Sequence, residues 1–419
     1  MAILLVLAGG CSLDQLNPNE PTEESVLTSV DGIKALAIGL QGQFGETVNE
    51  TIEVSNFLTK RYATMPSSVL GLRELETGGS DVQGFNGTVN AFWREHYRVI
   101  KSAEDLITYA PTVQLADSTR SGILALARLL KAMCLGELIE AYEQAPITVT
   151  GTGTPVFAGR TTVLATVIQL LESARDQIAT LPPSVDFRNN ILGNGLSLQN
   201  TINLMLARYA LVSGDYAKAI TAANAVDANT TSTLFYNSTN TRNPIFLITI
   251  QSVYYKPARS FRLNAETGDT NRVRFWVSPG TGNSFLGTPI DEFVQYRTDA
   301  SRYYLYVPGE VSLIRAEAYA RQNNLPAALT EVNAVRTKTT DAVGLGAGLP
   351  AKTLTDLPDQ SSMLAEIYLQ RQYELFETGL ALGDSRRFNQ PNASRTRNWL
   401  PYPDAERLSN PNTPADPQF

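Results

Sequence analysis

The chain has 419 residues, of which 43% are hydrophobic and 18% are charged, so it is long enough for one large folded domain or two packed ones. Its net charge is −7 and it has no extended run of Lys or Arg, which excludes the clustered cations that bind a phosphate backbone, and we expect no nucleic-acid partner. Its two cysteines, Cys11 and Cys134, exclude a disulfide scaffold and a four-cysteine zinc site.

The N-terminus has the pattern of a secretory signal. Residues 2–10 are apolar and then small, and they lead directly to Cys11. A cysteine at the cleavage point predicts a bacterial lipoprotein signal and lipobox at residues 1–11, with acyl chains on Cys11. The polar, Pro-punctuated stretch 12–30 is then a tether. The absence of a cationic start, and Ala8 where Leu is usual, keep open the alternative of a stray apolar N-terminus.

Helical periodicity dominates the middle of the chain. Apolar residues recur at spacings of three and four, which is typical of amphipathic helices. These stripes predict helical units at about 89–226 and 308–378, joined in places by breaks of only two to four residues. The first two stripes contain Val89, Trp93, Tyr97, Ile100, Ala103 and Ile107, and then Ile123, Ala127, Leu130, Cys134 and Leu138.

An internal repeat supports a helical scaffold. Residues Leu204–Val226 and Leu313–Val335 align at an offset of 109, with seven of 23 positions identical. Ala207 and Ala219, twelve residues apart around a turn, resemble the small-residue pattern of tetratricopeptide helix pairs. Chance similarity between two Ala-rich helices is the alternative. The fold class predicted is therefore mainly α, a tetratricopeptide-like helical-repeat scaffold.

The remaining segments have a different composition. Residues 228–307 are rich in Thr, Asn, Gly and aromatics, and they predict an irregular, loop-rich lobe with short strands, as at Ile245–Ile250 and Arg272–Val277. From Asn389 the chain is rich in Pro and Asn, so residues 389–419 are predicted to wrap the surface as a tail. Together, residues 31–419 are predicted to form a single domain.

The sequence lacks the residues that most enzymes need. His96 is the only histidine, which excludes HExxH and multi-histidine metal sites, and we expect it to be packed or at the surface of its helix. Phosphate-binding loops and GxSxG elbows are also absent. Glu374 and Glu377 lie near Arg371, Arg386 and Arg387, so ion pairing explains them more simply than glycoside hydrolysis. We predict no catalytic residues, no metal, no cofactor and no enzyme activity.

A set of collinear segments resembles the SusD/RagB family of nutrient-binding outer-membrane lipoproteins. After Cys11, these segments are FWREHYRVIKSAEDLI (92–107), LALARLLKAMCLGELIEAYEQAPI (124–147), RQYELFETGLALGDSRRF (371–388) and LPYPDAERLSNPN (400–412). Glu143 departs from the family pattern, which usually has Gly there, and Leu380-Ala381 replaces a stretch that usually carries Arg.

The resemblance implies a SusD-like α/α superhelix on the outer membrane, lipid-anchored and facing the cell exterior. It also implies a partner, a SusC-like TonB-dependent β-barrel transporter, to which the lipoprotein delivers an oligosaccharide or peptide nutrient. Two alternatives stay open: a tetratricopeptide-type protein-interaction scaffold without a small ligand, and a peptide-binding uptake subunit.

Candidate ligand residues follow from how sugars bind, with aromatic rings against C–H surfaces and a few polar side chains on the hydroxyls. For each aromatic residue, packing within the lobe is an equal alternative, whereas Trp93 is expected in the core and Trp399 in a structural role. The loop before the Trp93 helix contributes Asp81, Phe85 and Asn86, and the lobe contributes Tyr254, Tyr255, Phe261, Arg262, Asn264, Arg274 and Trp276.

Overall fold

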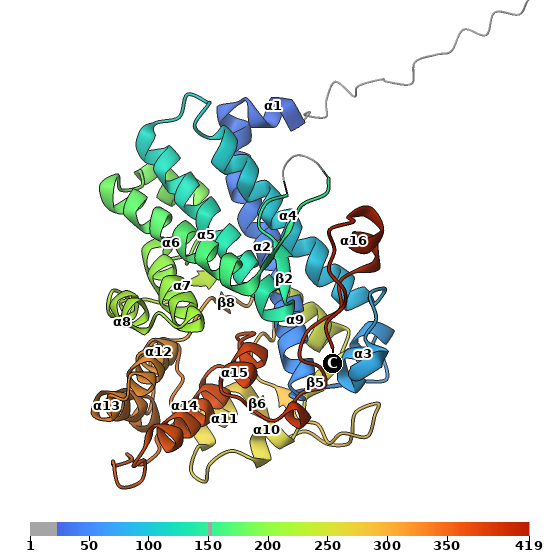
Figure 1. Cartoon of the computed structure of the whole chain (residues 1–419), viewed down its shortest axis with the longest axis vertical. Helices are drawn as coiled ribbons and strands as arrows, with labels where there is room; N and C mark the ends of the chain where they lie inside the picture. The colour runs from blue at the N-terminus through green and yellow to red at the C-terminus, as the bar shows by residue number, and fades with distance from the viewer. Residues whose placement is uncertain (1–22, 150–152, 419) are drawn as a thin grey trace, which may run out of the picture.

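The computed structural model describes residues 23–149 and 153–418, and within them helices predominate (Figure 1). The mainly α, tetratricopeptide-like prediction is confirmed. Four long helices, in which consecutive members pack against each other, form the N-terminal half: α2 (Val30–Leu58), α4 (Gly87–Tyr109), α5 (Asp117–Ala141) and α6 (Arg160–Thr180). The predicted stripe of α5, with Leu130, Cys134 and Leu138, is completely buried.

The repeat corresponds to two helix hairpins with the same turn. The first hairpin is α7 (Leu198–Ser213) with α8 (Tyr216–Asn224), and the second is α12 (Pro308–Arg321) with α13 (Leu325–Thr337). Gly214 and Asn323, which align in the repeat, both have positive φ, at 86° and 59°. The next residues, Asp215 and Asn324, both cap the second helix with their side chains.

Small residues set the spacing inside both hairpins. The four aligned alanines, Ala207, Ala219, Ala316 and Ala328, are all fully buried. Because a methyl group takes little room, the paired helices approach closely, and α8 of the first hairpin packs against α12 of the second.

The insertion lobe is built from short elements. Its strands form antiparallel pairs, and its helices are one or two turns long. The elements between α8 and α12 are β4 (Thr233–Leu234), α9 (Pro244–Phe246), the π-helical turn η3 (Leu247–Gln251), β5 (Tyr255–Pro257), α10 (Ser260–Leu263), α11 (Thr270–Trp276), β6 (Val277–Ser278), β7 (Glu292–Phe293) and β8 (Tyr303–Tyr304).

Short strands therefore occur in the lobe, but not where the two β-like runs predict them. Ile245–Ile250 lies in α9 and η3, and most of Arg272–Val277 lies in α11. Asn243 explains the first difference, because its side chain accepts the N–H groups of Ile245 and Phe246 and so starts a helix at Pro244. A short apolar run does not by itself distinguish a strand from a buried helical turn.

The other elements lie before, between and after the long helices. The C-terminal tail crosses the helices, and its backbone N–H groups at Thr396 and Leu400 donate to the carbonyls of Leu58 and Ala141. These elements are α1 (Glu23–Leu27), β1 (Tyr62–Thr64), α3 (Leu70–Thr77), η1 (Gly79–Asp81), β2 (Gln144–Pro146), β3 (Phe157–Gly159), η2 (Phe187–Ile191), α14 (Gln360–Glu374), α15 (Ala381–Arg387), η4 (Asn392–Ser394) and α16 (Asp404–Ser409).

The predicted tether reaches into folded structure. Residues 23–30, which the sequence places in the tether, contain α1 and the first residue of α2, whereas Cys11 lies outside the described residues. No helix of the described residues combines the length and the apolar character needed to cross a membrane.

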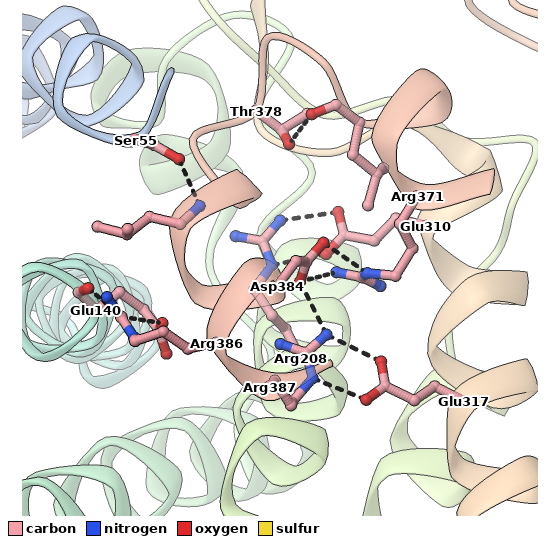
Figure 2. A network of polar contacts seen from close by, with 12 residues as sticks. Ser55, Glu140, Arg208, Glu310, Glu317, Arg371, Thr378, Asp384, Arg386 and Arg387 are labelled. Atoms are coloured by element: carbon pink, nitrogen blue, oxygen red, sulfur yellow. Dashed lines mark hydrogen bonds and ion pairs between the residues drawn. The ribbon is translucent and has the colours of Figure 1, made fainter. Parts of the chain in front are cut away.

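Buried ion pairs join helices that are far apart in sequence (Figure 2). Arg208 of α7 binds both carboxylate oxygens of Glu310 on α12, at 2.7 and 2.8 Å. Glu317 of α12 accepts two hydrogen bonds from Arg387 of α15, at 2.8 and 2.9 Å. These contacts fix the second hairpin against its neighbours.

A further pair links α14 to α15, where Arg371 binds Asp384 at 2.7 and 2.9 Å. Burial alone would raise the pKa of Asp384, but the guanidinium groups of Arg371 and Arg387 more than offset this, so its pKa is lowered. Asp384 therefore stays ionised at neutral pH.

Glu374 and Glu377 were expected to pair with the nearby arginines, but both have other partners. Arg371, Arg386 and Arg387 bind Asp384, Glu140 and Glu317 instead. Glu374 pairs with Arg272 and Lys338, which come from α11 and the segment after α13. Glu377 accepts the hydroxyl of Tyr62 at 2.7 Å. Proximity in sequence did not identify partners that the tertiary fold supplies.

We predict that Glu317→Gln destabilises the protein by about 3–5 kcal/mol, because it leaves the guanidinium of Arg387 facing an uncharged group in the core. The control is Glu172→Gln, which breaks a partly exposed pair with Lys218 and should cost less than about 1 kcal/mol. Chemical denaturation of both variants measures the difference, and equal losses would contradict a stabilising role of the network.

Candidate functional site

The cavity beside the ion network is too small for a nutrient. It lies between α2, α5 and α15, and its volume is about 50 Å³, enough for a few water molecules. Its polar wall is already satisfied at Glu137, which binds His96 at 2.8 Å. His96 was expected to be either packed or at the surface of its helix, and it is fully buried. This part of the molecule is structural.

A more open site starts where α3 meets α4. Asn86 accepts the N–H groups of Thr88 and Val89 and so caps α4. The amide group of the same side chain donates to the carbonyl of Gly71 and to Glu74, both in α3, at 3.0 and 2.7 Å. One buried asparagine therefore fixes the start of α4 against α3.

A loop of the insertion lobe reaches the same place. The loop joins β6 to β7, and its base is held by the Arg259 guanidinium, which donates to the carbonyls of Gly280 and Ile290. At its tip, the N–H of Phe285 donates to the carbonyl of Thr64 at 2.7 Å. The guanidinium of Arg73 on α3 lies 4.0 Å from the centre of the Phe285 ring.

Together these segments expose an apolar surface, which we call the α3 face. Apolar residues that gather on the surface of a folded chain often mark a binding site. Its members and their exposed fractions are Val69 (46%), Leu70 (68%), Phe85 (67%), Phe285 (50%) and Leu286 (48%). Figure 1 shows α3 on the same side of the molecule as α16.

Several residues predicted to bind ligand lie at or beside the α3 face. Phe85 is one of its members, and Asp81 is exposed in the adjoining turn η1. Asn86 is buried and acts as the cap described above. Tyr254 is half-buried, and its carbonyl accepts the N–H of Met65 in the segment before α3.

Two predicted aromatic residues belong to the core. Tyr255 is completely buried, stacks on Tyr62 with 4.7 Å between ring centres and donates its hydroxyl to Asn49. Trp276 is 1% exposed and donates its indole N–H to the carbonyl of Tyr373. Neither side chain offers a surface to a ligand, because both are packed in the core.

The remaining predicted residues are not brought to this surface as a group. Arg262 is held in a bidentate pair with Asp291, at 2.6 and 3.0 Å, below the loop that carries Phe285. Asn264 is exposed at the end of α10. Arg274 is exposed on α11, a helix that packs against α14, and Phe261 is buried against Phe376. Trp93 lies in the core as expected, at 7% exposure.

Sequence reasoning missed most of the α3 face. Phe285 and Leu286 stand between Gly282 and Gly287, and two large apolar residues at the tip of a Gly-containing loop could have indicated an exposed contact. Nothing local identifies Leu70 and Arg73, because their role depends on a loop more than 200 residues further along the chain.

A pocket of about 250 Å³ adjoins the α3 face at Val69. Glu50 and Glu53 of α2 form one wall, and the starts of α3 and α4 form the others. Burial raises the pKa of Glu50 to about 7 and that of Glu53 to about 8, and repulsion from Glu50 adds to the rise at Glu53. At neutral pH Glu50 and Glu53 therefore retain a proton that glutamates with an ordinary pKa would have lost.

A second groove, of about 490 Å³, lies between α4 and α16. Trp93 and Tyr97 form part of its floor, and the indole N–H of Trp93 donates to Glu406 at 3.2 Å. Since only 7% of Trp93 is exposed, this groove presents less aromatic surface than the α3 face does.

The raised pKa values predict how stability depends on pH. The native state binds more protons than the unfolded chain between the ordinary glutamate pKa and about 8, so stability falls as pH rises through this window. Glu53→Gln should reduce this fall between pH 5 and 8.5 by roughly 1–3 kcal/mol. Thermal melts across that range measure it, with the exposed Glu46→Gln on the same helix as the control. A curve unchanged from the native one would show that Glu53 is ionised throughout.

The fold has close counterparts among solved structures, although no family model and no curated protein matches the sequence. A SusD-like carbohydrate-binding protein from Bacteroides vulgatus superposes with a TM-score of 0.66 at 18% identity, covering 87% of this chain and 84% of that one. A SusD superfamily protein from Bacteroides fragilis gives 0.71 at 13%, covering 94% and 99%. B. fragilis NanU gives 0.70 at 13%, covering 96% and 99%. The chain therefore has the SusD-like fold that its sequence resemblance predicts.

Proposed function

We propose that this protein is a cell-surface lipoprotein of the SusD/RagB type that captures an oligosaccharide on the α3 face and delivers it to a TonB-dependent outer-membrane transporter. The observation that carries the proposal is the exposure of Phe85 and Phe285 in two segments that both contact α3 of a SusD-like fold. Aromatic rings pack against the C–H faces of sugars, and the neighbouring polar groups, among them Asp81 and Arg73, can reach hydroxyls.

The rest of the molecule supports a binding role. The helices form a scaffold that buried ion pairs hold together, so the α3 face has a rigid base. The lipid anchor at Cys11, the location on the outer membrane and the transporter partner are carried over from the sequence resemblance. We propose no catalytic step.

Binding measurements test the ligand site. On a glycan array, a protein that comprises residues 12–419 should bind oligosaccharides, and Phe85→Ala and Phe285→Ala should each weaken the binding about tenfold, because each removes one stacking surface. Arg94→Ser changes the groove between α4 and α16 and serves as the control. If Arg94→Ser weakens binding while the two Phe variants do not, the ligand binds in that groove instead. Binding of peptides without glycans would favour a peptide-uptake subunit.

Metabolic labelling tests the anchor. In a bacterial host that processes lipoproteins, the native protein should incorporate radiolabelled palmitate and fractionate with membranes. Cys11→Ser should abolish both, since it removes the only thiol at the predicted cleavage point. Equal labelling of the two proteins would contradict acylation at Cys11.

A further inference from the structure

The pocket beside the α3 face contains an unusual pair of acids. Glu50 and Glu53 lie one turn apart on α2 and face Gly71 of α3 and Thr88 of α4 across about 250 Å³. Val69 belongs to both the pocket and the α3 face, so the pocket adjoins that face.

These carboxylates lack partners that their burial requires. Glu53 is only 5% exposed, and its one hydrogen bond comes from Asn49, at 2.7 Å to Oε1. Oε2 of Glu50 is buried and has no hydrogen-bond partner. Within residues 23–149 and 153–418, neither acid has a Lys or Arg at ion-pair distance. A buried carboxylate without a cation is costly, and such groups are usually paired.

The rest of the fold follows that rule. Glu310, Glu317, Glu374 and Asp291 are each completely buried, and each pairs with at least one Arg or Lys. Glu377 has no cation at that distance, but it accepts the hydroxyl of Tyr62. The wall of the pocket brings two such acids together, and a cation from outside would stabilise their ionised forms.

The surroundings of the pair make the pocket more negative. Glu95 of α4 and Glu46 of α2 both raise the pKa of Glu50, and on α3 Glu74 is bound to Asn86. His96 of α4 acts in the opposite direction and lowers the pKa of Glu50, but its ring is held by Glu137. An acidic sugar would be repelled from this pocket, whereas a cation would be attracted.

We propose that this pocket is a subsite for a primary ammonium group, and that the oligosaccharide bound on the α3 face carries a free amino sugar. This inference rests on the proposed function and adds the ligand class. An ammonium group has three N–H donors, and the free oxygens of Glu50 and Glu53 provide two acceptors for it. A divalent metal fits less well, because Ca²⁺ takes about six to eight oxygen ligands and the described residues bring no third acid or histidine to the pair.

Calorimetry with three defined probes tests the subsite at neutral pH: a glucosamine trisaccharide, its fully N-acetylated form and a lysine-containing tripeptide. The native protein should bind the glucosamine trisaccharide at least about tenfold more tightly than the acetylated form, which has lost its charge. Glu50→Gln and Glu53→Gln should remove that preference. Asp31→Asn, which removes an exposed acid at the start of the same helix, should keep it. Both pocket variants keep the side-chain shape, and an unchanged melting temperature or a higher one shows that they fold.

The outcomes separate the subsite from the proposed function. Equal binding of both trisaccharides, lost in Phe85→Ala, would uphold glycan capture and overturn the ammonium subsite. Binding of the lysine peptide alone, lost in Glu53→Gln, would uphold the subsite and overturn the glycan. A Ca²⁺-dependent rise in melting temperature that Glu50→Gln abolishes would reassign the pocket to a metal. Absence of binding by all three probes would overturn both proposals.

Discussion

The pairing of buried charge holds this fold together. Helices α7, α12, α14 and α15 come from distant parts of the chain, and Arg–carboxylate contacts fix them to one another. Apolar packing alone tolerates sliding of one helix on another, whereas a bidentate pair has one geometry. Breaking such a pair leaves a buried charge uncompensated, so the arrangement resists rearrangement. This rigidity matters for the lobe, because isolated two-stranded pairs are marginally stable by themselves and need a fixed base.

The helical scaffold could be predicted in detail because its signals are local. The repeat at an offset of 109 identified two hairpins, and the correspondence extends to the left-handed residues Gly214 and Asn323 and to the caps that follow them. The helix α2 escaped prediction, although it has 29 residues. Its glycines weaken the intrinsic helical signal, and tertiary contacts compensate: the ring of Tyr236 packs against Gly45 and its hydroxyl donates to the Gly45 carbonyl.

The binding surface was predictable only in part, because long-range contacts create it. Phe85 was identified since it precedes a recognisable helix, but Phe285 reaches α3 only through the register of β6 with β7 and the contact with Thr64. Aromatic composition alone misled the choice of Tyr255 and Trp276. In a lobe with few long elements, large rings replace the missing helices as core, as the stack of Tyr255 on Tyr62 illustrates.

Two side chains beside α3 lie in environments that are unfavourable for their type. Phe85 leaves two thirds of its surface in water although it could contribute stability if buried, and Glu53 is buried without a cation, unlike Glu310 and Glu317. Either feature alone could be an accident of packing. Val69 lines the pocket and is also a member of the α3 face, so one ligand with an apolar face and a cationic group would satisfy both features. The scaffold that pairs Glu310 and Glu317 internally thus leaves Glu50 and Glu53 beside the surface where a ligand can pair with them.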